Sequence, residues 1–175
     1  MSSKRSAVFL DRDGTVIEEV DFLSCVDDMR IFPFTREALA LLKGRGYLVF
    51  ILTNQSGIGR GLFTEADMHG IHEALQNEVG GLIDGFFHCP HRPEFGCECR
   101  KPGIGMIEAA CETSEIDLES SWMVGDKSLD VMTGHRAGIR SVLVRTGYGQ
   151  TQDPPQSPTL IAENLLEAVK QILAS

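Results

Sequence analysis

The segment Ala7-Val8-Phe9-Leu10-Asp11-Arg12-Asp13-Gly14-Thr15 decides how the rest of this 175-residue chain is interpreted. Its four apolar residues predict a short buried strand. Two aspartates and a glycine follow where that strand ends, and Gly14 lets the backbone turn there. Further short apolar runs predict strands at Tyr47–Leu52, Gly85–Phe87, Trp122–Val124 and Ser141–Val144.

Segments with helical spacing lie between these runs, and the longest opens with Thr64 and Asp67 as a capping box. We also predict a closing helix at about 160–173, after the proline-containing stretch Gln150–Pro158. The alternation predicts an α/β fold with a Rossmann-like, mainly parallel sheet flanked by helices. The predicted internal helices are Thr35–Lys43, Thr64–Val79, Met106–Thr113 and Leu129–Ala137.

Composition excludes several classes of partner. A formal net charge of −9 argues against a broad electrostatic surface for nucleic acid. No apolar run approaches the ~20 residues that a membrane span needs, and Met1–Ser6 lacks a signal-peptide core. We therefore expect a single domain over residues 1–175 that is cytoplasmic and monomeric, with no nucleic-acid or membrane partner.

Polar clusters follow the predicted strands, at Thr53-Asn54-Gln55-Ser56-Gly57, Cys89-Pro90-His91 and Gly125-Asp126-Lys127-Ser128. The carboxyl ends of parallel strands meet at one edge of a sheet, where ligands bind. Each member has an ordinary alternative when it is taken alone: Thr53 as a helix cap, Lys101 as a solvated charge, Asp126 as a turn. Their common position at one edge favours a shared site.

The cluster Asp11-Arg12-Asp13-Gly14-Thr15, after the first predicted strand, has residues suited to phosphoryl transfer. Asp11 could attack phosphorus, and Asp13 could protonate the leaving oxygen and later activate water. Thr53 could donate to phosphate oxygens, Lys101 offers a fixed positive charge, and Asp126 and Asp130 offer hard oxygen ligands for Mg²⁺. Paired aspartates before a glycine also occur in plain surface turns and loose calcium loops.

The order of these motifs, from Asp-x-Asp-Gly-Thr through Thr53 and Lys101-Pro102 to Gly125-Asp126, resembles the haloacid dehalogenase superfamily of phosphatases. The resemblance covers about residues 7–147 and implies a phosphatase with a minimal cap. Asp130 would support the site without touching the metal in many relatives. The resemblance implies Asp11, Asp13, Thr53 and Lys101 as catalytic residues, and Asp11, Asp13 and Asp126 as magnesium ligands.

A second metal is predicted by the loop 88–100. Three of the five cysteines fall within it, which is not the pattern of a disulfide framework. Cys89, His91, Cys97 and Cys99 match the ligand number and type of a closed, structural zinc site. Unligated thiols, or His88 in place of His91, remain alternatives. The zinc would order the loop and present Arg100 and Lys101 to phosphate.

This loop is similar to that of the heptose bisphosphate phosphatases and histidinol-phosphatases, and the stretch Thr53–Phe63 resembles the former. The resemblance implies removal of the 7-phosphate from a heptose 1,7-bisphosphate, a step toward lipopolysaccharide precursors. Asn54 and Gln55 would bind substrate, and Arg60 and Arg100 suit its second phosphate. Histidinol-phosphate hydrolysis is the alternative substrate. Phosphotransfer to an alcohol and a non-catalytic zinc-loop binding module are alternatives of other classes.

Overall fold

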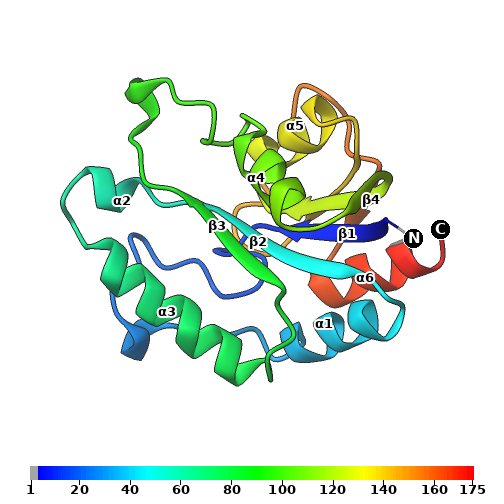
Figure 1. The fold of residues 1–175 in the computed structure, drawn as a ribbon, viewed down its shortest axis with the longest axis horizontal. Coiled ribbons are helices and arrows are strands. Elements are labelled where there is room, and N and C mark those ends of the chain that lie inside the picture. The colour runs from blue at the N-terminus through cyan, green and yellow to red at the C-terminus, as the bar shows by residue number, and fades with distance from the viewer. Residues whose placement is uncertain (1–3) are drawn as a thin grey trace.

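The computed structural model describes residues 4–175, so residues 1–3, at the start of Met1–Ser6, lie outside the described range. Its strands are β1 (Arg5–Leu10), β2 (Leu48–Asn54), β3 (Gly85–Cys89), β4 (Ile116–Gly125), β5 (Arg140–Val144) and β6 (Leu160–Ala162). They form a six-stranded sheet in the order β3-β2-β1-β4-β5-β6 (Figure 1). All neighbouring pairs are parallel, as the alternating pattern predicted.

Helices cover both faces of the sheet. In Figure 1, α1 (Thr35–Gly44), α3 (Glu65–Glu78) and α6 (Leu165–Leu173) lie below it, and α4 (Gly105–Thr113) and α5 (Ser128–Arg136) lie above. The four predicted internal helices are thus confirmed to within one residue at each end. The capping box is also confirmed, because the Thr64 hydroxyl accepts from the Asp67 N–H and the Asp67 carboxylate accepts from the Thr64 N–H.

The central position of β1 explains its uninterrupted apolar sequence. Val8 and Leu10 face the larger core, which contains residues of α1, α3 and α6. Ala7 and Phe9 face a second core, which contains residues of α4. A strand that is buried on both faces has no need for the polar alternation of a surface strand. Asp11 is the first polar side chain beyond it, at the carboxyl edge of the sheet.

The C-terminal segment corrects the prediction of one helix over 160–173. Residues Leu160–Ala162 form the edge strand β6, and α6 begins only at Leu165. Leu160 and Ala162 suit either period, so their pattern did not separate strand from helix. The unpaired edge of β5 decides the outcome, since its Val144 pairs with Ala162.

Three short elements and the start of β4 were not predicted. A 3₁₀ turn at Val26–Asp28 follows the Asp11 motif, α2 (Ser56–Gly59) follows β2, and another 3₁₀ turn occupies Pro93–Phe95 in the metal loop. β4 begins at Ile116, well before the predicted Trp122–Val124. Such elements of three or four residues are too short to leave a periodic pattern.

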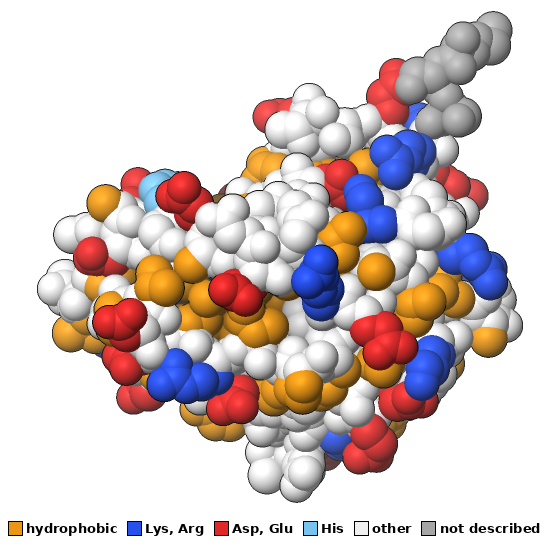
Figure 2. All heavy atoms as spheres, turned by 90° about the horizontal axis from the view of Figure 1, so that it is seen from below, with side chains coloured by type: hydrophobic (Ala, Val, Ile, Leu, Met, Phe, Trp, Pro, Cys, Tyr) orange, Lys and Arg blue, Asp and Glu red, His pale blue; other side chains and the backbone are white. Residues whose placement is uncertain are grey.

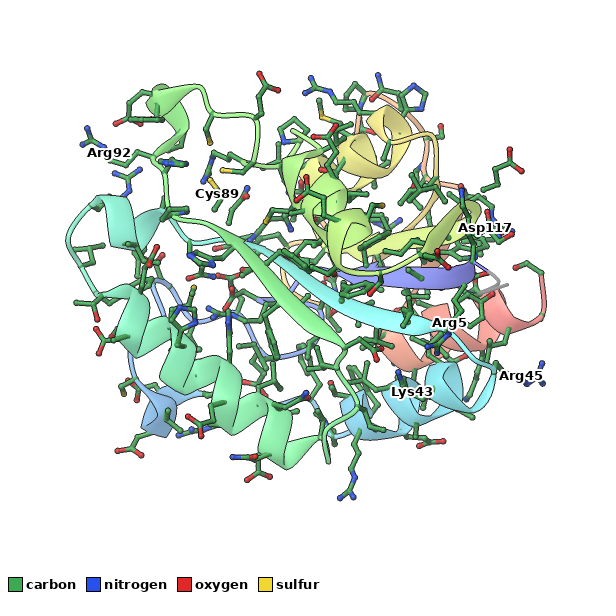
Figure 3. The ribbon with its side chains drawn as sticks, in the orientation of Figure 1. Arg5, Lys43, Arg45, Cys89, Arg92 and Asp117 are labelled. Atoms are coloured by element: carbon green, nitrogen blue, oxygen red, sulfur yellow. The ribbon has the colours of Figure 1, made fainter. Side chains whose placement is uncertain are left out.

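The two ends of the sheet differ in character. Figure 3 shows Arg5 and Asp117 near the amino ends of β1 and β4, and Cys89 at the opposite end, where β3 leads into the metal loop.

The face seen in Figure 2 carries acidic and basic side chains interspersed with small apolar areas. None of the helices within residues 4–175 combines the length and apolar character that crossing a membrane requires.

Replacing Asn164 by Ala should lower the free energy of unfolding by about 1 kcal/mol, because Asn164 caps the N-terminus of α6. Its Oδ1 accepts from the Glu167 N–H at 3.1 Å. Chemical denaturation of the variant measures the loss, and Glu163→Ala, at the adjacent exposed position, is the matched control. Equal stability of Asn164→Ala and Glu163→Ala would contradict the capping role.

Candidate active site

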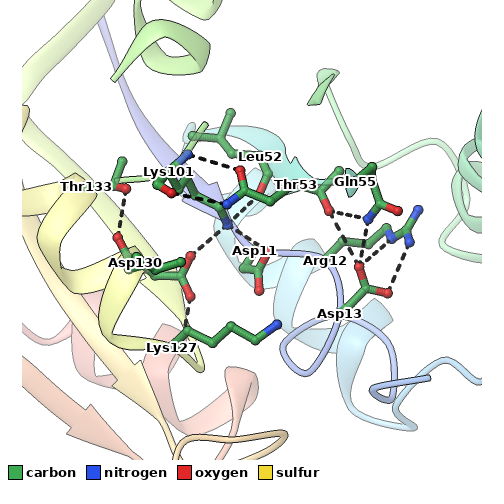
Figure 4. Close-up of polar contacts among 12 residues, drawn as sticks. Asp11, Arg12, Asp13, Leu52, Thr53, Gln55, Lys101, Lys127, Asp130 and Thr133 are labelled. Atoms are coloured by element: carbon green, nitrogen blue, oxygen red, sulfur yellow. Dashed lines mark hydrogen bonds and ion pairs between the residues drawn. The ribbon is translucent and has the colours of Figure 1, made fainter. Parts of the chain in front are cut away.

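Lys101 is the centre of the polar cluster at the carboxyl edge of the sheet. Its buried Nζ donates to Asp11 Oδ1 at 2.8 Å, to Asp130 Oδ1 at 2.7 Å and to the Leu52 carbonyl at 2.9 Å (Figure 4). All three ammonium protons therefore have partners. Burial alone would lower the pKa of Lys101, but Asp11 and Asp130 raise it above its usual value. The side chain carries a permanent positive charge next to Asp11.

Asp11 is kept ionised by two cations. Burial opposes its charged form, yet the ammonium groups of Lys101 and Lys127 outweigh that effect and lower the pKa of Asp11. Lys127 directly follows Asp126 in the sequence and lines the cavity with Asp11. Its Nζ also donates to Glu19 Oε2 at 3.2 Å. An ionised carboxylate at the end of β1 is the state that a nucleophile needs.

Asp126 is buried and lacks one hydrogen-bond partner. Its Oδ2 accepts from the Tyr148 N–H at 2.8 Å, and its fully buried Oδ1 has no partner among the described residues. Burial, followed by the neighbouring charge of Asp11, raises the pKa of Asp126 to about 8. A cation beside Oδ1 would reverse this shift and satisfy the orphaned oxygen.

Asp11, Asp126 and Asp130 fit a magnesium ion as a group, because they can place one carboxylate oxygen each within 4.8 Å of one another. Asp130, however, gives Oδ1 to Lys101 and Oδ2 to the Lys127 N–H at 3.0 Å. Both of its oxygens therefore have partners, so its geometry favours support of Lys101 over direct metal binding. Asp11 and Asp126 are the better candidates for ligands.

The Asp13 carboxylate does not join this group, although the sequence suggested it as a magnesium ligand. Arg12 donates to both of its oxygens at 3.1 Å, and Gln55 Nε2 donates to Oδ2 at 3.0 Å (Figure 4). Thr53 Oγ1 lies 3.5 Å from the same oxygen and accepts from Gln55 at 2.7 Å. These contacts give both oxygens of the Asp13 carboxylate partners within the protein.

Asn54 holds Lys101 in place through the backbone of that lysine. Its Oδ1 accepts from the Lys101 N–H at 3.0 Å, and its Nδ2 donates to the Lys101 carbonyl at 3.2 Å. The sequence suggested that Asn54 and Gln55 bind substrate. Both line the cavity beside Asp13, but their side-chain amides already join the strand-end loop to Lys101 and Asp13.

The metal loop brings together the four residues predicted for zinc. Cys89 Sγ lies 3.5 Å from Cys97 Sγ, and Cys99 Sγ lies 3.3 Å from Cys97 Sγ. His91 Nδ1 lies 3.5 Å from Cys89 Sγ and 3.4 Å from Cys99 Sγ. A tetrahedron with ~2.3 Å metal–sulfur bonds has edges of roughly 3.8 Å, so the cluster needs little expansion to hold zinc. His88 instead contacts Glu65 at 3.2 Å.

The cavities at this edge are open and polar. One of about 180 Å³ is lined by Asp11, Asp13, Arg100, Lys101 and Lys127, among others. A recess of about 110 Å³ beside it is lined by residues of the segment 19–23 together with Arg12 and Asp13. Arg100 therefore lies on the wall of the cavity that contains Asp11. Arg60 is exposed, with its guanidinium 6.0 Å from the ring centre of Phe22, which lines the recess.

Comparison with known proteins agrees with this arrangement. Residues 98–168 match the family model described as HAD-hydrolase-like. The chain is 37% identical to D-glycero-beta-D-manno-heptose-1,7-bisphosphate 7-phosphatase of Haemophilus ducreyi, over 96% of this chain and 98% of the relative. It is 38% identical to the D-glycero-alpha-D-manno enzyme of Photorhabdus laumondii, over 97% of this chain and 98% of the relative.

The chain belongs to the heptose-1,7-bisphosphate 7-phosphatase family. A crystal structure of the D,D-heptose 1,7-bisphosphate phosphatase of B. bronchiseptica, complexed with magnesium and phosphate, matches it with a TM-score of 0.90. That match has 33% identity and covers 97% of this chain and 98% of the other. The chain is thus a phosphoric monoester hydrolase with the haloacid dehalogenase fold, as the resemblance implied. Phosphatases of this type use Mg²⁺.

Sequence reasoning missed several residues of this phosphatase site. Lys127 was quoted only as part of a cluster, yet it lines both cavities and lies beside Glu19. Burial opposes its charge, but the four surrounding carboxylates raise the pKa of Lys127. Arg12, the unassigned position of the Asp-x-Asp motif, forms a buried contact with His72 of α3, which lies outside the motifs. A lysine directly after Asp126 was a signal that could have been used.

Replacing Gly147 by Ala should weaken Mg²⁺ binding about 10- to 100-fold, as the loss of a group supporting a metal ligand does. Gly147 has φ 56°, and an added Cβ would overlap Asp126 Oδ2. Calorimetric titration with Mg²⁺ measures the effect. Gly138→Ala is the matched control, because Gly138 has φ 70° and no atom within 4 Å of the added Cβ. Equal Mg²⁺ affinity in both variants would contradict the prediction.

Purified protein should contain about one zinc ion per chain, and Cys97→Ser should lower both the melting temperature and the affinity for phosphate. The loop would lose a ligand, and Arg100, which donates to the His91 carbonyl at 3.3 Å, would lose its support. Elemental analysis and thermal melts measure these effects. Cys25→Ser, at an exposed cysteine outside the cluster, should change neither. Zinc-free protein of normal stability would refute the site.

Proposed function

We propose that the chain hydrolyses the 7-phosphate of D-glycero-D-manno-heptose 1,7-bisphosphate through a phospho-aspartate on Asp11. The reaction would serve synthesis of nucleotide-activated heptose, the precursor of the lipopolysaccharide core. The observation that carries the proposal is the ionised Asp11 carboxylate fixed against Lys101 at 2.8 Å beside the orphaned oxygen of Asp126. The names of the relatives support the choice of substrate. A cytoplasmic monomer that acts on a soluble sugar phosphate is part of the same proposal.

The first step would be attack of an Asp11 oxygen on phosphorus. The bond between phosphorus and the sugar oxygen breaks, and that oxygen takes a proton from Asp13. Lys101 and Lys127 would oppose the negative charge that gathers on the phosphoryl oxygens. Mg²⁺, held by Asp11 and Asp126, would add a divalent positive charge there and fix the phosphate. Thr53, next to Asp13, is a further donor to phosphate.

The second step would release inorganic phosphate. Asp13 accepts a proton from water, the water oxygen attacks phosphorus, and the acyl phosphate bond breaks to restore the Asp11 carboxylate. Asp13 is suited to both proton transfers because it lines both the cavity with Asp11 and the neighbouring recess. The openness of these cavities would let water reach the intermediate.

Arg100 is the side chain best placed for the distal phosphate. It lines the cavity with Asp11, and it also lines a wider groove of about 570 Å³ that extends past Leu129 to Arg136. A guanidinium fork binds phosphate through two hydrogen bonds. Arg60 would contribute from its position beside Phe22. Histidinol phosphate has no second phosphate for either residue, which favours the bisphosphate over it.

Phosphotransfer to an alcohol would use the same residues, so product analysis separates it from hydrolysis. A binding module without turnover is disfavoured by the arrangement of Asp11, Asp13 and Lys101 at one cavity. The two curated relatives differ in the anomer that their names give. The anomer that this chain prefers is therefore left open within the proposal.

Replacing Asp11 by Asn should reduce turnover at least about 1,000-fold while the protein stays folded, because an amide cannot form the acyl phosphate. Phosphate release measures activity, and circular dichroism checks folding. Asp117→Asn, near the opposite end of the sheet (Figure 3), is the control and should keep full activity. Retention of more than a few per cent of wild-type turnover by Asp11→Asn would sink the covalent mechanism.

Among sugar and amino-alcohol phosphates, the heptose 1,7-bisphosphate should have the highest kcat/KM, because its distal phosphate supplies binding energy to the transition state. Arg100→Ala should then cost about 1–3 kcal/mol with the bisphosphate and much less with a hexose monophosphate. Arg60→Ala should show the same preference more weakly. Arg45→Ala, near the opposite end of the sheet (Figure 3), should leave kcat/KM unchanged for both substrates.

A higher kcat/KM for histidinol phosphate would refute the heptose assignment and leave the Asp11 chemistry intact. Equal losses on the bisphosphate and the monophosphate in Arg100→Ala would show that Arg100 supports the site and does not recognise the second phosphate. The two results are independent, because one compares substrates on the wild type and the other compares variants.

A further inference from the structure

Arg12 is a buried cation with no role in the reaction described above. Arg12 is only 1% exposed and is one of the largest fully buried side chains. Nε donates to Asp13 Oδ2 and one terminal nitrogen donates to Asp13 Oδ1, both at 3.1 Å. Burying a guanidinium is costly unless it is paired and hydrogen-bonded. Its presence beside Asp13 therefore needs a reason beyond packing.

His72 occupies the remaining side of the Arg12 guanidinium. Its Nε2 lies 3.1 Å from Arg12 Nη1. A guanidinium can only donate, so Nε2 must accept and the proton of the neutral ring must lie on Nδ1. Burial, then the charge of Arg12, then the nearby His88 and His69 lower the pKa of His72 to about 3. The neutral, accepting ring is thus its state at physiological pH.

The imidazole is itself held by the fold. It extends from α3 and stacks on the ring of Phe86 in β3, with ring centres 4.6 Å apart and planes 17° apart. A continuous series of contacts therefore runs from β3 through His72 and Arg12 to the Asp13 carboxylate. Within the described residues, Arg12 donates side-chain hydrogen bonds only to Asp13 and His72.

We propose that Arg12 and His72 are positioning residues that fix the Asp13 carboxylate in the orientation for proton transfer to the leaving oxygen. The proposal rests on the acid/base role of Asp13 in the proposed function. Arg12 donates hydrogen bonds to both carboxylate oxygens, so the Asp13 side chain cannot rotate without breaking two contacts. His72 in turn prevents the guanidinium from tilting. Misplacement of a catalytic group by about 1 Å can cost on the order of 100-fold in rate.

The test uses the dependence of the first chemical step on the leaving group. An alkyl ester, such as the best sugar phosphate of the substrate comparison, needs a proton on its leaving oxygen. The leaving group p-nitrophenolate needs almost none. The pre-steady-state burst of released alcohol or p-nitrophenol, at saturating Mg²⁺, reports the formation of the phospho-aspartate alone. A positioning defect should slow the alkyl ester selectively, whereas a general loss of structure would slow both esters alike.

His72→Phe keeps a ring to stack on Phe86 but removes the acceptor of Arg12. Its burst rate should fall about 10-fold with the alkyl ester and less than about 2-fold with p-nitrophenyl phosphate. KM and the Mg²⁺ affinity should stay near the wild-type values. His72→Gln, which restores an acceptor, should recover most of the rate. His69→Phe, at an exposed position of the same helix, is the control and should match the wild type.

Arg12→Lys tests the second positioning residue and serves if His72→Phe does not fold, since an ammonium cannot grip two oxygens as the planar fork does. It should show the same selective loss. Equal effects on both esters, or no effect in either variant, would overturn the proposal. Asp13→Asn is the reference. If that variant also fails to discriminate between the esters, then the acid role of Asp13 is wrong and the proposal falls with it.

Discussion

The buried ammonium of Lys101 is the interaction on which the rest of the site depends. It joins the ends of β1 and β2 to α5 through Asp11, the Leu52 carbonyl and Asp130. The side chain of Asn54 fixes the backbone of Lys101. A lysine so deeply buried is tolerable only because every proton has an acceptor. The same contacts that stabilise the charge place it where a phosphoryl group would meet Asp11. The contacts that support the structure would therefore also provide the electrostatic catalysis that we propose for Lys101.

The excess of carboxylate at this edge favours the binding of a metal ion. Asp11, Asp126 and Asp130 face Lys101 and Lys127, which leaves more negative than positive charge in a buried place. In the protein alone, burial and the neighbouring charge of Asp11 raise the pKa of Asp126 to about 8, so its charged form is disfavoured. A divalent cation would remove this constraint. The orphaned Asp126 oxygen marks the side on which it would bind.

Much of this could be predicted from the sequence, because the informative residues are local. Apolar runs ending in Asp11, Thr53 and Asp126 indicated the sheet and its functional edge, and the loop spacing indicated the Cys and His cluster. The failures concern contacts between distant segments. Leu160–Ala162 becomes a strand only because β5 has a free edge. The bond between Arg12 and His72 joins residues 60 positions apart, and no local pattern specifies it.

The same distinction separates the residues that we propose to catalyse from those that we propose to select a substrate. Asp11, Asp13 and Lys101 are held by strand ends and buried hydrogen bonds, so their geometry follows from the sheet. Arg100, Arg60 and Phe22 lie on loops, where the sheet does not determine position. A zinc ion in the Cys89, His91, Cys97 and Cys99 cluster would supply the missing rigidity. The exposed Phe95 packs on His91 with ring centres 4.6 Å apart. Zinc would therefore act on substrate choice through Arg100, whereas Lys101, the next residue, is also held by Asn54, Asp11 and Asp130.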